Sequence, residues 1–312
     1  MGISPAMVDP PPWLQSFLDR LAAEDLSAAT RRGYRYDLLQ FAVWYAALYG
    51  NSPDLPRLTE HDVIAWRQHM ITRCQFRATT INRRLEAVRR VLRWAEATGV
   101  VAANVAAGVR TIRLTGDRQP VGLTAVEVHG LLRAAGESSH GLARRNYALV
   151  QLMLQTGLRI GEVAALRRAD ITLRERAGVL RVRHGKGLRE REVPLNATAR
   201  RALRQVFERD PAPARPEDPV FRSTRGEPLP VRSIQNTISG LVRRAGLKRA
   251  GISAHSLRHT FALAWLRQHP GKLVELAQLL GHESLDTTAV YTRASTEDLA
   301  RDVEQTPFNL DG

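Results

Sequence analysis

Cysteine, lysine and long apolar runs are scarce in this sequence. Cys74 is the only cysteine among 312 residues, which excludes an intramolecular disulfide and gives no support to a thiolate metal cluster. No apolar run reaches the roughly 20 residues that a membrane-spanning helix needs. The proline-rich N-terminus also lacks the basic-then-apolar order of a signal peptide. We therefore expect a soluble, cytoplasmic protein with no membrane partner.

The charge balance indicates a polyanionic partner. Lys and Arg total 46 against 31 Asp and Glu, a formal net charge of +15, and most of the excess lies after residue 117. Such a chain favours nucleic acid, although charge alone does not separate DNA from RNA. Only Lys186, Lys248 and Lys272 are lysines, for which a coding bias toward arginine is the simple explanation. A retained lysine is still informative, because it can release a proton near neutral pH and arginine cannot.

The length exceeds what one compact core usually holds, so we expect two domains. Residues 1–10 are expected to form a flexible segment, 11–103 a helical domain, 104–120 a linker and 121–312 a second domain. In the first domain apolar residues recur every three or four positions, which predicts a small bundle of helices. Its last two helices are expected from Glu60 to Arg73, with Thr59 as N-cap, and from Thr79 to Thr98, ended by Gly99.

Two predicted helices of the first domain begin with hydroxyl and basic side chains. For any one such run a solvated charged face is the ordinary explanation. Two of them in one bundle favour phosphate contacts, since helix N-termini also present free backbone N–H groups. The candidate nucleic-acid-binding residues are Thr30, Arg31, Arg32, Arg35, Thr79, Thr80, Asn82, Arg83 and Arg84.

The second domain is predicted to be mainly helical around a small β-hairpin. Residues 178–184 and 189–195 alternate apolar and polar side chains on either side of Gly185-Lys186-Gly187, which places Lys186 at the tip of a hairpin. The proline-rich stretch from Asp210 to Pro230 is expected to loop over the surface. A short amphipathic helix is expected from Ser295 to Glu304. The remaining segments predict helices at 124–135, 142–157, 232–245, 255–267, 272–280 and around Tyr291.

Five short segments of the second domain carry residues suited to phosphate chemistry. They are Thr156-Gly-Leu-Arg159-Ile-Gly-Glu162, Gly185-Lys186-Gly187, His255-Ser-Leu-Arg258-His259, Leu280-Gly-His282, and Tyr291 nine residues after His282. In this order and spacing they resemble the tyrosine recombinase (phage integrase) family, which includes the Xer resolvases and mobile-element integrases. The resemblance covers nearly the whole chain. One departure is Asn104-Val105, where relatives usually have Asn-Pro after the last helix of the first domain.

The resemblance implies a fold and a partner. It implies a C-shaped, two-domain DNA clamp, with a helical, SAM-like core-binding domain and a mainly helical catalytic domain that holds a small β-hairpin or sheet. The partner would be double-stranded DNA with a specific core site, bound by a homotetramer on two such sites. The helix at 295–304 would dock in a neighbouring subunit through Leu299 and Val303. A paralogous recombinase or a DNA-bending protein is left open as a further partner.

The expected chemistry needs neither metal nor cofactor. Arg159 and Arg258 suit the two non-bridging oxygens of a phosphodiester, because a guanidinium is permanently charged and binds two oxygens at once. Lys186 suits protonation of the 5′ leaving oxygen. Tyr291 would attack phosphorus and form a 3′-phosphotyrosine. The resemblance assigns acid–base help to His255 and a phosphate contact to His282.

Simpler explanations exist for several of these residues. A lone tyrosine near a C-terminus is usually an ordinary amphipathic side chain, and only the upstream set favours Tyr291 as a nucleophile. His259 is expected to be structural. Its spacing from His255 suggests zinc only superficially, because the His-Glu-x-x-His order is absent. Glu162 is expected to orient an arginine, with an exposed helix carboxylate as the alternative.

Three functions fit the sequence to different degrees. A site-specific recombinase for integration, excision or dimer resolution is the leading hypothesis. A type IB topoisomerase would share the phosphotyrosine chemistry, but the Xer-like first domain argues against it. A binding-only DNA regulator descended from a recombinase would not need the intact set of Arg159, Lys186, His255, Arg258, His282 and Tyr291.

Overall fold

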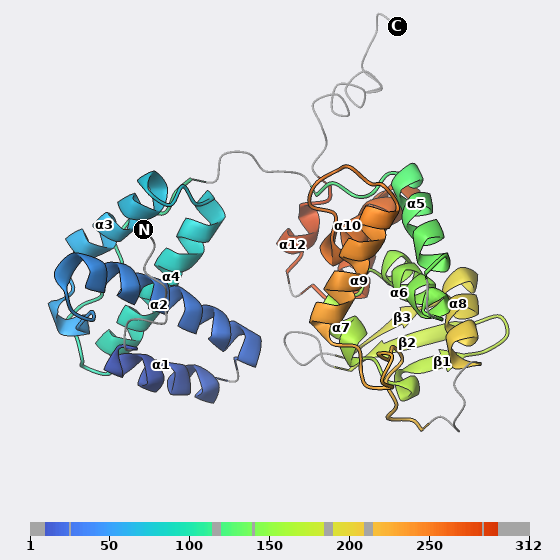
Figure 1. The fold of residues 1–312 in the computed structure, drawn as a ribbon, viewed down its shortest axis with the longest axis horizontal. Helices are drawn as coiled ribbons and strands as arrows, with labels where there is room; N and C mark the ends of the chain where they lie inside the picture. Colours follow the sequence, from blue (N-terminus) through green and yellow to red (C-terminus); the bar gives the residue numbers. More distant parts are fainter. Residues whose placement is uncertain are drawn as a thin grey trace, which may run out of the picture. The chain divides into compact units, whose positions relative to one another are not determined.

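The computed structural model describes residues 10–24, 26–113, 120–138, 141–183, 190–208, 215–282 and 284–292. The chain divides into two compact units, Met1–Asp117 and Arg118–Gly312, drawn in Figure 1. Each unit is described by itself below. In the parts of the chain that the structure describes, no helix is long and apolar enough to cross a membrane.

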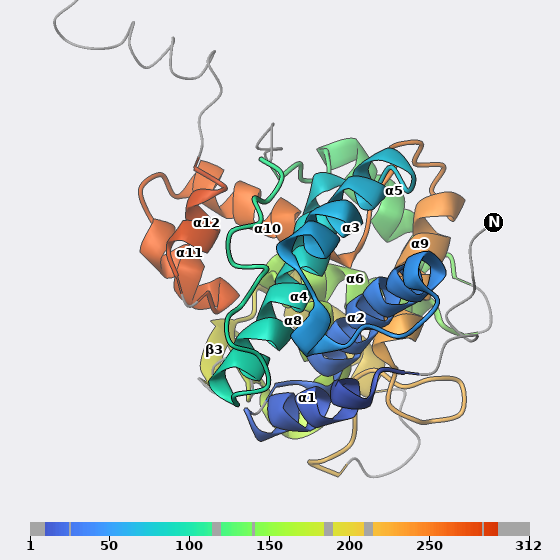
Figure 2. The same cartoon turned by 90° about the vertical axis from the view of Figure 1, so that its left-hand side faces the viewer.

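In its described residues the first unit is a bundle of four α-helices, shown from a second direction in Figure 2. They are α1 (Pro12–Ala23), α2 (Ala28–Tyr49), α3 (Glu60–Thr72) and α4 (Ala78–Ala97), with a 3₁₀ turn at Leu55–Arg57. Side-chain caps fix two of the starts: the Ser27 hydroxyl accepts the Thr30 N–H, and Thr59 forms a reciprocal capping box with Asp62. The apolar faces meet in a core that includes Phe17, Phe41 and Leu92.

The chain after α4 stays attached to that helix through residue 112. Ala106 and Val109 are buried, and the Arg89 guanidinium donates to both of their carbonyl oxygens. The Asn82 side chain exchanges two 2.8 Å hydrogen bonds with the main chain of Ile112. The first half of the expected linker at 104–120 is therefore part of the first unit. The apolar periodicity typical of a helix is absent from this segment because the chain forms a turn that packs against α4.

Asn104 holds this turn without a following proline. Its Oδ1 accepts the Ala106 N–H at 3.0 Å, and its Nδ2 donates to the Arg89 carbonyl at 3.2 Å. Asn104 therefore fixes the turn by hydrogen bonds to two backbone groups, whereas a proline would fix it by restricting the backbone angle φ.

The second unit is mainly helical with one small sheet. Helix α6 (Ala143–Thr156) lies at its centre and packs against α5 (Ala125–Gly136), α8 (Ala197–Phe207) and α10 (Ala254–Gln268). Its side chains from Ala148 to Met153 are almost completely buried, so α6 is the core of this unit. The other α-helices described in this unit are α7 (Ile160–Ala165), α9 (Val231–Arg244), α11 (Leu273–Leu280) and α12 (Asp286–Ala289), and a 3₁₀ turn lies at Arg168–Asp170.

The sheet has three antiparallel strands in the order β1-β2-β3: Ile171–Leu173, Gly178–Val182 and Arg191–Pro194. The predicted hairpin is β2 and β3, in which Leu180 pairs with Val193 and Val182 with Arg191. Its tip, with Lys186, lies outside the described residues. Strand β1 was not predicted, because three residues are too few to show an alternating pattern.

The stretch expected to loop over the surface at 210–230 enters the core. Val220 and Phe221 are buried, the Val220 N–H donates to the Leu166 carbonyl at 3.0 Å, and Phe221 accepts from the Leu229 N–H at 2.9 Å. This corrects the expectation for the described residues 215–230. Two apolar side chains among prolines and charges were too weak a signal to predict burial.

Candidate active site

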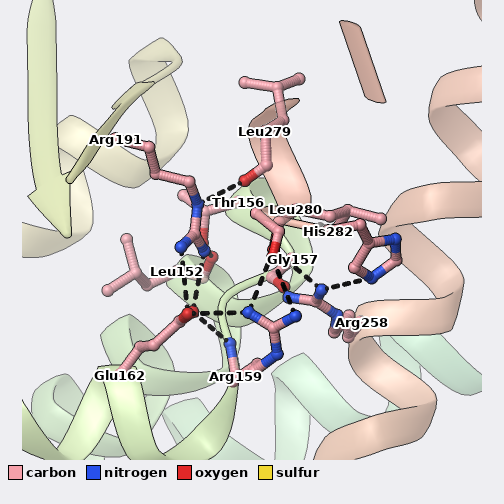
Figure 3. Close-up of polar contacts among 11 residues, drawn as sticks. Leu152, Thr156, Gly157, Arg159, Glu162, Arg191, Arg258, Leu279, Leu280 and His282 are labelled. Carbon is pink, nitrogen blue, oxygen red and sulfur yellow. Dashed lines mark hydrogen bonds and ion pairs between the residues drawn. The ribbon is translucent and has the colours of Figure 1, made fainter. Parts of the chain in front are cut away.

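The site begins at a sharp turn that ends α6. Gly157 has φ +64°, a backbone conformation that residues with a Cβ rarely adopt, and a Cβ there would lie 2.5 Å from Phe261 Cδ1. The turn makes Arg159 the N-cap of α7. The Arg159 N–H then donates to Glu162 Oε2 at 2.8 Å, and its Nη1 donates to Glu162 Oε1 at 3.1 Å. Figure 3 shows this pairing.

Two guanidinium groups converge on the ends of two helices (Figure 3). Arg258 Nη1 donates to the Gly157 carbonyl at 2.6 Å, and its Nη2 donates to the Leu280 carbonyl at 2.9 Å. Arg159 Nη2 donates to the Gly281 carbonyl at 3.0 Å. The last carbonyls of a helix have no partner within it and carry partial negative charge. They therefore fix the two arginines without neutralising them.

Positive charge exceeds negative charge in this cluster. Arg159, Arg191 and Arg258 surround one carboxylate, Glu162. Burial, together with the charge of Arg159, lowers the pKa of Arg258 to about 10, which still leaves it charged at neutral pH. Arg258 is 3% exposed, whereas the Arg159 side chain is 38% exposed. A cluster with more guanidinium groups than carboxylates, of which Arg159 is partly exposed, is suited to binding an oxyanion.

Arg191, on β3, is a member of the cluster that the sequence did not reveal. It forms a bidentate pair with Glu162, at 3.0 and 2.8 Å, and its Nε donates to the Leu279 carbonyl at 2.9 Å. Burial raises the pKa of Glu162, but the hydrogen bonds and charges of Arg191 and Arg159 outweigh it and lower the pKa overall. Glu162 thus ties α7 to β3 and α11 while it orients Arg159.

His282 lies beside Arg258. Arg258 Nη2 lies 2.8 Å from His282 Nε2, so that nitrogen accepts the hydrogen bond; Nδ1 then carries the proton and donates to Thr288 Oγ1 at 2.7 Å. Burial, then the charge of Arg258, lowers the pKa of His282 to about 4. His282 is therefore neutral at pH 7.

Tyr291 reaches the same cluster from the turn after α12. It is 9% exposed, and its Oη lies 2.8 Å from His259 Nδ1. Burial raises the pKa of Tyr291, while the positive charges of Arg258 and Arg159 oppose that shift. The tyrosine hydroxyl is thus within electrostatic range of both arginines of its own chain. The ring of His255, which is exposed, packs edge-on against His259 with centroids 4.2 Å apart.

The structure brings together most of the residues that the sequence singled out in the second unit. Arg159, Glu162, Arg258, His282 and Tyr291 are linked as described, and His255 and His259 lie beside Tyr291. Lys186 lies outside the described residues. Within those residues no group of three or more His, Cys, Asp or Glu side chains could hold a metal ion.

The nucleic-acid-binding candidates of the first unit fall into two groups. Thr30, Arg32, Arg35 and Thr79 are exposed, Arg31 and Thr80 are half-buried, and the exposed Arg83 pairs with Asp37. Arg84 is 5% exposed, pairs with Asp37 at 3.7 Å and stacks over Phe76. Asn82 is occupied by Ile112. For Arg84 and Asn82 these contacts favour a structural role over DNA contact. The sequence did not show this, because helical periodicity alone does not tell which basic side chains are buried.

Comparisons with known proteins show the family to which this chain belongs. The sequence pattern of the phage integrase family matches residues 122–298, and that of the phage integrase N-terminal SAM-like domain matches residues 14–99. The tyrosine recombinase XerC of Corynebacterium efficiens is 32% identical over 273 residues, covering 88% of this chain and 83% of the relative. The tyrosine recombinase XerD of Ralstonia nicotianae is 33% identical and covers 92% and 91%.

A solved structure shares the fold. The XerH site-specific recombinase bound to its difH substrate in a pre-cleavage complex superposes with a TM-score of 0.70 at 22% identity, covering 98% of this chain and 85% of that one. The present chain belongs to the phage integrase family of tyrosine recombinases. The predicted fold class, mainly helical with a small sheet, is confirmed.

Proposed function

We propose that this protein is a site-specific DNA recombinase that cuts and rejoins double-stranded DNA through a 3′-phosphotyrosine intermediate. The observation that carries the proposal is the position of Tyr291, buried in the cluster of its own chain that holds Arg258 and Arg159. Tyrosine recombinases at 32–33% identity over about nine-tenths of the chain support the same function. DNA integration, excision or dimer resolution would all use this reaction.

The arginines would act by stabilising charge. When Tyr291 Oη attacks phosphorus, negative charge builds on the two non-bridging oxygens. Arg258, fixed by the carbonyls of Gly157 and Leu280, and Arg159, held by Glu162, are positioned before the substrate arrives, so little reorganisation is needed. The O–P bond to tyrosine forms as the P–O5′ bond breaks. The phosphotyrosine retains the bond energy for rejoining, so no ATP is needed.

The proton transfers are assigned to lysine and histidine. Lys186 would protonate the departing 5′ oxygen, His255 would help as an acid–base group, and His282 would donate to the phosphate. His282 Nε2 accepts from Arg258 in this structure, so it can donate to phosphate only after protonation or a change of tautomer. Binding of a phosphate would favour that change, because it offsets the positive charge that lowers the histidine's pKa.

The expected assembly is a homotetramer on two DNA sites in the cytoplasm, with the segment 295–304 docking in a neighbour. The oligomer rests on the resemblance and on the amphipathic pattern of residues 295–304, which lie outside the described residues. The location rests on the sequence pattern, which has the features of neither a signal peptide nor a membrane span. Deleting residues 295–312 is expected to abolish pairing of two DNA sites while sparing binding to one. Gel mobility assays that separate single-site and paired complexes would measure this, and a deletion variant that still pairs sites would contradict the assembly.

Covalent trapping tests the proposed function. Wild-type protein and Tyr291→Phe are incubated with nicked suicide duplexes that carry sequence from beside the native gene, and products are separated in SDS. An adduct with wild type that is absent with Tyr291→Phe is expected. Absence of an adduct on DNA that the wild-type protein demonstrably binds would argue against the function.

A further inference from the structure

We propose that His259 is the group that accepts the proton of Tyr291 when the tyrosine attacks DNA. This assignment rests on the proposed function, and it differs from the structural role that the sequence suggested for His259. Among the residues that the structure describes, His259 is the one whose side chain hydrogen-bonds the Tyr291 hydroxyl, with Nδ1 2.8 Å from Oη. A base must lie within hydrogen-bonding distance of the proton that it removes, and His259 meets this condition in the free protein.

The neighbouring histidine occupies a different position. His255 is exposed, one helical turn before His259, and its ring touches that of His259 edge-on. Among the described residues it has no hydrogen bond to Tyr291. His255 is therefore open to solvent, while His259 packs against Tyr291. The proposal thus moves the acid–base role that the resemblance assigned to His255 to its neighbour His259.

The charges around His259 connect its basicity to substrate binding. Among the described residues, the titratable or charged groups that face it are His255 and Arg258, from its own helix α10, and Tyr291, from the turn after α12. Burial, then His255 and Arg258, lowers the pKa of His259 to about 4, so its ring is neutral and able to accept a proton at pH 7. A DNA phosphate on Arg258 would offset part of that positive charge and strengthen the base where it is needed.

The Tyr291 O–H proton moves to His259 Nδ1 as Oη bonds to phosphorus, the P–O5′ bond breaks, and O5′ takes a proton from Lys186. His259 is then an imidazolium and Lys186 a neutral amine. In rejoining, the 5′-hydroxyl returns its proton to Lys186 and the imidazolium returns its proton to Tyr291, which leaves with its electron pair restored.

The experiment measures the rate of adduct formation by the full-length protein on an ordinary suicide substrate and on one with a bridging 5′ sulfur. The sulfur leaves without a proton, so it bypasses the leaving-group acid but not activation of the tyrosine. The variants are His259→Asn, which keeps a hydrogen-bond acceptor but cannot take a proton, and His259→Ala with and without added imidazole. Lys186→Ala is the comparison, and His129→Asn, an exposed histidine on α5, is the control.

Both His259 variants should form adduct about 100-fold more slowly than wild type on both substrates, the usual size of an acid–base contribution. Sulfur should rescue Lys186→Ala only, and imidazole should speed His259→Ala. If His259→Asn forms adduct at the wild-type rate, His259 only positions the tyrosine. If the variant is faster than wild type, the contact between His259 and Tyr291 is inhibitory. Either result overturns the proposal. Wild type and His129→Asn must both form adduct, so a failure of the recombinase function itself is recognised separately. Unchanged thermal unfolding of His259→Asn excludes misfolding.

Discussion

At the scale of single residues, the contacts of Arg258 and Glu162 explain why the site keeps a net positive charge. Arg258 is 3% exposed, yet its contacts include two carbonyl groups and a neutral histidine, and none of the carboxylates that the structure describes hydrogen-bonds to it. Glu162 is shared between Arg159 and Arg191. The cluster therefore keeps a surplus of positive charge in a mostly buried place, an arrangement that costs stability in the free protein and favours an anion once it binds.

Replacing Arg191 should impair cleavage although the residue need not touch DNA. In Arg191→Ala, Glu162 loses its bidentate partner and is left to neutralise Arg159 more fully, so cleavage should slow roughly 10–100-fold, in line with loss of an outer-shell partner. Stability should fall by about 1–3 kcal/mol. Adduct formation and urea unfolding measure the two effects. Arg181→Ala, an exposed arginine on the neighbouring strand, is the control, and equal behaviour of the two variants would refute the positioning role.

Acid should destabilise the second unit through His259 and His282. Both pKa values are lowered from 6.5 to about 4 by burial and nearby cations, so the unfolded chain binds more protons than the folded one between those values. Stability should therefore decline as pH falls below about 6.5 and continue to decline toward 4. Urea unfolding from pH 7 to 4 measures the slope. The double variant His259→Asn, His282→Asn should flatten it, and an unchanged slope would contradict the assignment.

Residues of distinctive chemistry could be singled out from the sequence, whereas residues whose role depends on contacts with distant parts of the chain could not. Tyr291 and the histidines stood out because spaced motifs carried them. Arg191 could not be distinguished among so many arginines, since its role depends on Glu162 and the Leu279 carbonyl, which are distant in sequence. The contact between His259 and Tyr291 is likewise a product of folding across 32 positions.

At the scale of elements, the turn between α6 and α7 positions the first arginine of the site. Gly157 and Gly281 both adopt positive φ at helix ends, and a Cβ on Gly281 would lie 2.6 Å from Arg191 Nη1. These helix ends bring the carbonyls of Gly157 and Leu280 to Arg258. The geometry of the arginine cluster thus depends on where two helices end.

Gly157→Ala should lower the free energy of unfolding by more than the same substitution at a left-handed glycine that has open space around it. Gly246→Ala, also at positive φ (+66°) but in open space, should cost about 1–2 kcal/mol from backbone strain alone. Gly157→Ala adds a clash with Phe261 and Leu280, worth about 1–3 kcal/mol more, and should also slow cleavage by displacing Arg159. Chemical denaturation and adduct assays of the two variants provide the comparison. Equal costs would show that the turn is not tightly packed.

Helices were predicted more reliably than short or irregular elements. The long helices carry apolar periodicity and clear caps, as at Thr59 and Thr124. The six-residue α7 and the three-residue β1 are too short for any period to show, and tertiary contacts to α9 and β2 hold them in place.

At the scale of the whole molecule, net charge should govern affinity for DNA. A chain with a net charge of +15 that neutralises several phosphates releases their counterions on binding. Affinity for a duplex site should therefore fall by roughly 10²–10⁴-fold between 50 and 200 mM salt. Fluorescence anisotropy of labelled duplex measures this. The double variant Arg32→Ala, Arg35→Ala should reduce the salt slope if these exposed residues contact phosphate, and an unchanged slope would remove them from the interface.

If Tyr291 is the nucleophile, it becomes the covalent link to DNA, and peptide mapping of the adduct identifies the linked residue. Trypsin should cut after Lys272 and Arg293, releasing residues 273–293, in which Tyr291 is the only tyrosine. After nuclease digestion, mass spectrometry should find that peptide carrying a nucleotide through its 3′ phosphate on Tyr291, with a 5′-hydroxyl on the released DNA. A nucleotide on another residue, or a 5′ linkage, would contradict the account.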